Sequence, residues 1–209
     1  MRKILLALPL FAAVPLIAQS APQVPGTMDV ARVTAGTYNT DPSHTLIGWR
    51  VSHFGFNDYF GIFGDATGTL ILDPKKLNAS KVDITIPVGK VTTASSGLTG
   101  HLLRAGKDGG KPDFFGPAPA DAKFVSTSVV AKGTTAKITG NLTLNGVTKP
   151  VVLDTRFSGA GNNPYSKKAT VGFHATTTIK RSDFGVNYGI PVVSDEVKLD
   201  ITVAFEKAS

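Results

Sequence analysis

The sequence predicts an all-β fold of eight mostly antiparallel strands. Segments rich in β-branched and aromatic residues recur along the chain, each bounded by glycine, proline, asparagine or aspartate. Within several of them, apolar and polar side chains alternate. The segments are 45–53, 60–72, 81–91, 123–130, 136–144, 149–157, 169–180 and 196–205. At 209 residues the chain is long enough for one domain with a sizeable core. The pattern by itself fits a closed barrel or a sandwich of two sheets.

Three of these segments alternate clearly enough to assign an inward face, because successive side chains of a strand point to opposite sides. Their other faces are mainly polar or small, as expected for a sheet with one side in water. The inward residues are Ile47, Trp49, Val51 and His53 in the first segment, Val82, Ile84, Ile86 and Val88 in the third, and Val197, Leu199, Ile201, Val203 and Phe205 in the last.

The connections predict four successive antiparallel strands in the second half of the chain. Asn145-Gly146 readily supplies the two positive φ angles of a type I′ hairpin turn. Gly133 and the segment 159–164 are the other expected turns. After the third segment, residues 92–122 are too long for a tight turn, and Leu98–Arg104 predicts a short helix within them. Loops of that length in compact domains are usually functional.

The N-terminus predicts an exported protein. Arg2 and Lys3 precede an apolar run over 4–17 and a small-x-small site at 18–20, so residues 1–20 are expected to be a signal peptide. Pro9 and Pro15 interrupt this apolar run, which is already short for spanning a bilayer, so a signal peptide is expected in preference to a transmembrane anchor. Residues 21–37 have no apolar periodicity and are expected to form a flexible leader, with the domain over 38–207. The expected location is periplasmic or secreted.

Composition narrows the chemistry. The chain has no cysteine, which excludes disulfides, thiolate catalysis and zinc–thiolate sites. The formal charge is +7, and it falls to +5 once Arg2 and Lys3 are removed. A basic surface suits anionic lipids, anionic head groups or the cell envelope, and it equally suits a soluble protein without a charged partner.

Catalytic and metal motifs are missing from the sequence. His44, His53, His101 and His174 are far apart and show no helical metal-binding spacing, so no metal site is predicted. Asp41, Ser43 and His44 are near neighbours on an extended segment, where they point in different directions and cannot form a triad. Nucleic-acid binding is also not expected, because the aromatic residues alternate toward the interior and the chain carries an export signal.

The stretch 49–64 is the strongest candidate for a pocket wall. It contains the single tryptophan of the chain and four of its twelve phenylalanines, interrupted by Gly55, Gly61 and Gly64. Most aromatic residues fill cores, but glycines leave space where a filled core favours large side chains. His53 ends the inward series, so it either orients a ligand head group or is a core-edge histidine bonded to backbone.

Short motifs, in order, resemble the YceI-like family of exported, lipocalin-like proteins associated with polyisoprenoid binding. The resemblance covers residues 38–207. The motifs are Tyr38-x-x-Asp41-Pro42-x-His44, Val51-x-His53-x-Gly55 with Gly61-x-Phe63, His101-Leu102 with Asp113-Phe114-Phe115, Phe124-x-Ser126-Thr127, the run from Gly140 to Val151, and Arg181-Ser182-Asp183-Phe184-Gly185. The resemblance implies an eight-stranded antiparallel barrel whose tunnel holds the isoprenoid tail of a lipid or quinone.

This chain departs from the family pattern near the expected tunnel entrance. A Gly- and Lys-rich segment is inserted between Leu102 and Asp113, residues 117–122 replace a usual Lys-Tyr-Pro, and Ala66 stands where an aromatic residue is common. The shape of the entrance, and with it the size of the ligand, is therefore expected to differ from the family pattern.

The resulting hypothesis is an exported carrier or sequestering protein, not an enzyme, that binds an isoprenoid lipid or quinone non-covalently. His53 or Arg181 is expected to meet the head group, although Arg181 and Asp183 equally suit a structural role in the turn before the last strand. The expected ligand-binding residues are Trp49, Val51, His53, Phe54, Phe56, Phe60, Phe63, Phe114, Phe115, Phe173 and Arg181.

Two other function classes stay open on the sequence. One is an enzyme that acts on a small lipid or sugar through His44, His53 or His101. The other is an accessory subunit of a membrane electron-transfer system with a quinone-like ligand. Transient contact with a membrane surface and a homodimer are further candidate interactions.

Overall fold

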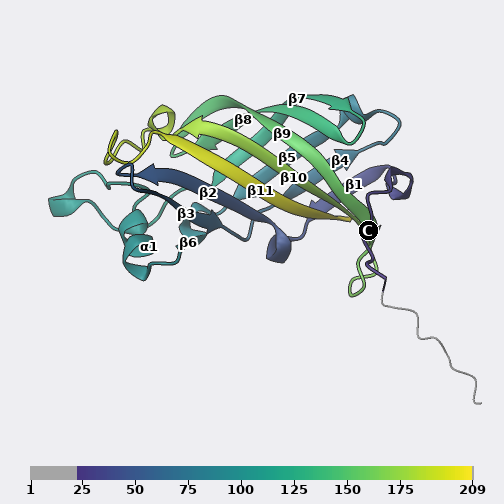
Figure 1. Ribbon diagram of the computed structural model, residues 1–209, viewed down its shortest axis with the longest axis horizontal. Helices are drawn as coiled ribbons and strands as arrows, with labels where there is room; N and C mark the ends of the chain where they lie inside the picture. The colour runs from purple at the N-terminus through teal and green to yellow at the C-terminus, as the bar shows by residue number, and fades with distance from the viewer. Residues whose placement is uncertain (1–22, 209) are drawn as a thin grey trace, which may run out of the picture.

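The computed structural model describes residues 23–208, so the expected signal peptide lies outside the described residues. Strands run along the long axis of the molecule; the helix α1 lies toward one end and the C-terminus at the other (Figure 1). The strands are β1 (Gly36–Thr40), β2 (Leu46–His53), β3 (Asn57–Phe63), β4 (Thr67–Leu72), β5 (Lys81–Ile86), β6 (Val91–Thr93), β7 (Ala122–Lys132), β8 (Thr135–Leu144), β9 (Val147–Asn162), β10 (Ala169–Lys180) and β11 (Glu196–Lys207). The helix is α1 (Ser96–Leu103), and the 3-10 turns are η1 (Val30–Arg32), η2 (Pro42–His44), η3 (Leu77–Ala79), η4 (Val88–Lys90), η5 (Lys107–Gly109) and η6 (Arg181–Phe184).

Within residues 23–208, eight strands form a closed antiparallel barrel in the order β1-β4-β5-β7-β8-β9-β10-β11. Pairing of β1 with β11 closes the ring, with Tyr38 opposite Lys207 and Thr40 opposite Phe205. The first half of β11 pairs instead with β2, which continues through β3 to β6 as an extension of the sheet. The expected eight-stranded barrel is confirmed, because closure leaves no sandwich of separate sheets.

Two segments expected as single strands are each divided. The segment 60–72 is interrupted at Asp65, whose φ of 56° is left-handed, so the chain changes direction between β3 and β4. The segment 81–91 ends its first part at Ile86, because Pro87 has no N–H to continue the ladder and the turn η4 follows. Both breaks occur where the sheet passes from the closed ring to the extension.

The predicted turns are confirmed in two places and wrong in the third. Asn145 and Gly146 have φ angles of 51° and 76°, and Gly133 turns β7 into β8 with a φ of 58°. The turn expected over 159–164 lies later, because β9 continues to Asn162. The Oδ1 of Asn163 accepts hydrogen bonds from the backbone N–H groups of Tyr165 and Ser166, so Asn163 starts the turn.

The N-terminal segment is part of the folded unit, which was expected to begin near Tyr38. Thr27 and Ala160 exchange backbone hydrogen bonds of 3.1 and 2.8 Å, and β1 already begins at Gly36. A Cβ at Gly161 would collide with the carbonyl of Pro25. The glycines that suggested a turn therefore admit the close approach of another backbone segment.

Buried side chains form two clusters inside the barrel. One surrounds Tyr38, Phe157, Val171 and Phe205, and the other gathers Phe124, Leu142, Val151 and Phe184. Several of the aromatic residues are therefore ordinary core residues, as expected for most of them.

The long connection 94–121 contains the helix α1, which confirms the short helix expected near Leu98–Arg104. The Oγ of Ser95 caps it by accepting a hydrogen bond from the N–H of Leu98. None of the helices in residues 23–208 is long and apolar enough to cross a membrane.

Candidate functional site

The barrel encloses two neighbouring cavities. The near cavity, beside α1, has a volume of about 830 Å³, and the far cavity, beside η1 and η3, has a volume of about 420 Å³. Ile47 lines both, so the two cavities lie on either side of that residue. Each volume lies in the usual range for small-molecule sites. Their walls are almost entirely apolar and together extend along much of the interior.

The inward faces assigned from alternation are confirmed. In the near cavity the wall includes Trp49, Val51 and His53 of β2 together with Val197 and Leu199 of β11. The remaining members of the β11 series and two members of the β5 series line the far cavity. These residues come from paired strands of one sheet, so strand alternation alone places them on a common surface.

Trp49 is accommodated by a glycine on the neighbouring strand. Trp49 pairs with Gly61 of β3, and a Cβ at Gly61 would lie 2.5 Å from Cζ2 of the indole and 2.6 Å from the carbonyl oxygen of Thr92. The indole therefore packs directly over the bare backbone. Its Nε1 is buried and finds no hydrogen-bond partner among the described residues.

Aromatic rings from separate segments cover one side of the near cavity. His101 of α1, Phe114 and Tyr188 contact one another edge to face, with centroids 5.2, 5.3 and 5.4 Å apart. Phe115 packs similarly against Phe63, at 6.0 Å. Edge-to-face geometry is the preferred arrangement of such rings. The long connection thus folds over the opening left beside β6.

An ionic cluster holds this cover together. An oxygen of Asp113 lies 2.8 Å from Nη2 of Arg104 and 2.7 Å from Nε2 of His101. The hydrogen bonds from Arg104 and, secondarily, His101 hold the pKa of the Asp113 carboxyl below its usual value. The cluster joins the end of α1 to the chain that follows the inserted segment.

We expect acid to loosen this cover. Since the pKa of Asp113 is lowered on folding, its contribution to stability is present above its unfolded pKa, near about 3.9, and is lost as pH falls through the lowered value. Urea midpoints at neutral pH and below pH 4 measure the loss. Asp113→Asn should lose less stability than wild type over this range, whereas Asp154→Asn, an exposed partner of Lys137, should behave as wild type. Equal losses in all three proteins would contradict the expectation.

Arg181 is tied to backbone carbonyls. Its side chain is 6% exposed. Nε donates to Ser194, Nη1 to Val186 and Tyr188, and Nη2 to Val193, over 2.8–3.0 Å. Burial lowers the pKa of this guanidinium, and the nearby carboxylate of Asp195 partly opposes the shift. The side chain therefore fastens the loop 185–195.

The carboxylate that helps to hold this loop is Asp195, whereas the sequence suggested Asp183. Asp195, and not Asp183, accepts hydrogen bonds from the backbone N–H and the hydroxyl of Ser182, at 2.9 and 2.7 Å. The structural role expected for Arg181 in fastening this turn is therefore confirmed, but the expected participation of Asp183 is wrong. A head-group contact stays a prediction, since Arg181 also lines the near cavity.

The expected ligand-binding residues divide into three groups. Near the α1 end, the lining contains Trp49, Val51, His53, Phe54, Phe63, Phe114, Phe115 and Arg181. Phe173 lines the far cavity, where its ring contacts those of Phe157 and Phe205. Phe56 and Phe60 line neither cavity. Whether the lining residues contact a ligand stays a prediction.

The inward placement of Phe56 and Phe60 is wrong. Phe56 is 89% exposed and lies in the turn between β2 and β3. Phe60 is 64% exposed on the outer face of β3, with the guanidinium of Arg50 5.6 Å from its ring centroid. Because Phe63 and Gly61 face inward, alternation sends Phe60 outward and brings Tyr59 into the cavity wall.

The sequence did not predict that the loop 185–193 contributes to the cavity wall. Tyr188, Val192 and Val193 line the near cavity, although the segment shows no periodicity that the sequence could reveal. Tyr59, by contrast, could have been found by counting back in steps of two from Phe63. Arg181 and the backbone bonds to the β2–β3 turn hold these loop residues at the cavity.

The four histidines lie in separate environments. His53 and His101 line the near cavity. His44 is bonded to Asp41 at 2.7 Å within η2, and His174 to Asp200 at 2.6 Å. In the part of the chain that the structure describes, no group of three or more histidines and carboxylates is arranged to hold a metal ion.

Comparison with known proteins agrees with this architecture. Residues 38–205 match the family model described as the YceI-like domain. The protein belongs to the YceI-like family. It is 38% identical over 172 residues to Protein YceI of Salmonella arizonae, and the match covers 81% of this chain and 86% of that protein. The corresponding protein of Salmonella heidelberg gives the same values.

Solved structures share the barrel. A Campylobacter jejuni YceI protein matches with a TM-score of 0.62 and 29% identity, covering 76% of this chain and 90% of that one. BcnA of Burkholderia cenocepacia matches with a TM-score of 0.66 and 24% identity, covering 79% and 98%. A polyisoprenoid-binding domain of Saccharophagus degradans matches with a TM-score of 0.56 and 16% identity, covering 82% and 98%. The last two similarities establish the fold alone.

Proposed function

We propose that this YceI-like protein is an exported carrier or sequestering protein that holds one long isoprenoid lipid or quinone inside its barrel. The observation that carries the proposal is the pair of neighbouring apolar cavities, both lined by Ile47, in the barrel and beneath its extension. Burial of apolar surface contributes about 25 cal/mol per Å², so a long chain gains affinity along the whole interior.

The relatives support the ligand class by analogy of fold. The Saccharophagus degradans domain is described as polyisoprenoid binding, and at 16% identity it shares the architecture of this chain. Function depends on the site more than on the fold, so the apolar lining is the stronger argument. The apparent signal peptide supports a periplasmic location.

The polar groups of the near cavity suit recognition of a head group. His53 and His101 face the cavity at the end where the long connection covers it. A quinone carbonyl or an isoprenol hydroxyl offers an acceptor for such donors.

Mass spectrometry of a solvent extract of the native protein tests the proposal. We expect a polyprenyl compound, and its absorption spectrum distinguishes a quinone from an isoprenol. Protein freed of lipid should take up geranylgeraniol, with a change in tryptophan emission because the single tryptophan lines the cavity. Absence of bound lipid together with absence of uptake would overturn the carrier function. Turnover of a lipid by the delipidated protein that His53→Ala abolishes would favour an enzyme.

A further inference from the structure

The opening of the near cavity is marked by residues that line it and are also exposed. Phe54, Tyr188 and Val192 are 52%, 49% and 54% exposed, and all three belong to the cavity wall. Phe56, two residues from Phe54, is still more exposed. We call these four residues the apolar rim. Exposed aromatic side chains grouped at one place are typical of an interaction site.

The backbone holds the apolar rim in place. The N–H of Phe54 donates to the carbonyl of Val192 at 2.7 Å, and the N–H of Ser194 donates to the carbonyl of Ser52 at 2.9 Å. His53 and Val193 form an antiparallel bridge. Two separate loops are therefore joined below the exposed rings. Their order reduces the entropy lost when the rim contacts a partner.

Basic side chains lie on the inserted segment beside this rim. Lys107 and Lys111 belong to the connection after α1, and Nζ of Lys111 lies 3.5 Å from the carbonyl oxygen of Gly185, in the loop that carries Tyr188. Figure 1 shows the β2–β3 turn, this loop and the inserted segment gathered at one end of the barrel. Exposed aromatic rings with neighbouring cations favour an anionic lipid surface.

The opposite end of the barrel differs. There, the exposed residues that line the far cavity include Gly133, Thr134 and Thr135 together with Val30 and Pro74, so that rim is mixed and carries no exposed aromatic ring. The N-terminal segment exposes Val24, Met28 and Val30 at that end, without an aromatic ring among these three. In the described structure, exposed aromatic rings line the opening of the near cavity and not that of the far cavity.

We propose that the apolar rim docks on a bilayer with anionic head groups, so that the near cavity opens directly toward the acyl region. The proposal rests on the proposed lipid-carrying function and adds the surface through which the lipid passes. Because Phe54 belongs to both the rim and the cavity wall, an apolar chain can move between them without crossing water. A protein docked on the same residues would cover the opening, so the geometry favours a membrane.

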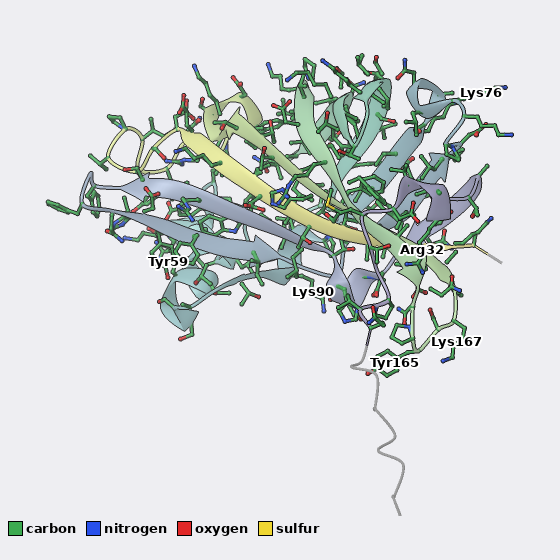
Figure 2. All side chains as sticks on the ribbon, turned by 45° about the vertical axis from the view of Figure 1, so that its right-hand side comes forward. Arg32, Tyr59, Lys76, Lys90, Tyr165 and Lys167 are labelled. Atoms are coloured by element: carbon green, nitrogen blue, oxygen red, sulfur yellow. The ribbon has the colours of Figure 1, made fainter. Side chains whose placement is uncertain are left out.

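Flotation with vesicles of phosphatidylglycerol and phosphatidylethanolamine tests this docking. Phe56→Ser should bind the vesicles about tenfold more weakly than wild type, because the ring no longer enters the interface. Tyr165→Ser is the matched control: Tyr165 is 93% exposed at the end of the barrel away from α1 (Figure 2). Its binding should equal that of wild type. Wild type should also bind phosphatidylcholine vesicles less well.

The proposal is overturned if wild type does not bind the anionic vesicles, or if Phe56→Ser binds as wild type does. An equal decrease in Phe56→Ser and Tyr165→Ser would also overturn it. Uptake of geranylgeraniol from solution, followed by tryptophan emission, separates docking from ligand binding. Phe56→Ser should retain this uptake, since Phe56 lies outside both cavities. If wild type takes up no geranylgeraniol from solution, the proposed carrier function is contradicted instead.

Discussion

Ala175→Phe is expected to weaken binding of a long isoprenol strongly while leaving a short one almost unaffected. Ala175 is buried in β10 and faces the far cavity. It pairs with Ile201, which pairs in turn with Ile47, the residue shared by both cavities. A phenylalanine here therefore occupies part of the far cavity on the side nearest Ile47. If five carbon groups lose burial at about 0.8 kcal/mol each, affinity falls by up to about a thousandfold.

Titrations with solanesol and geraniol measure this effect. Solanesol needs both cavities under the proposed function, whereas geraniol is short enough for the near cavity alone. Thr176→Phe is the matched control, because the next residue of the same strand is exposed on the outer face. Equal affinities of Ala175→Phe and Thr176→Phe for solanesol would show that the far cavity takes no part in binding.

Arg181→Ala is expected to lower the free energy of unfolding by about 3–5 kcal/mol, since removal of a buried charged group leaves its partners unpaired. Four backbone carbonyls lose their donor, so the loop that carries Tyr188 and Val193 is held less firmly against η6. Urea unfolding measures the change. Arg50→Ala, at an exposed arginine, should change the stability by no more than about 0.5 kcal/mol.

Ligand titrations with the Arg181 variants decide whether this residue also contacts the head group of a ligand. Squalene has an isoprenoid chain without a head group, and farnesyl pyrophosphate carries an anionic one. If Arg181→Ala binds both as wild type does, Arg181 is structural and the head-group contact is wrong. Arg181→Lys, which keeps the positive charge with fewer donors, serves the same comparison if the alanine variant does not fold.

Strands with strict alternation were predictable because their inward residues are set by local geometry. The series in β2 and β11 lines the cavities as expected, and the Asn145-Gly146 turn is where its two positive φ angles require it. Phe60 shows the limit of this reasoning. Its side chain is as apolar as that of Phe63, and only the register of β3 against β2 distinguishes the outer face from the inner one.

The sequence by itself determined most of the strands, the inward face of three segments and the family. These depend on periodicity and on turn residues, which act over a few neighbouring positions. The tertiary structure alone decided where the interior opens. Arg181 holds a loop without any pattern against the β2–β3 turn, and His101 meets Asp113 across the inserted segment. Contacts between residues far apart in the chain have no local signature, so the rim and the cover of the cavity emerge only in the folded molecule.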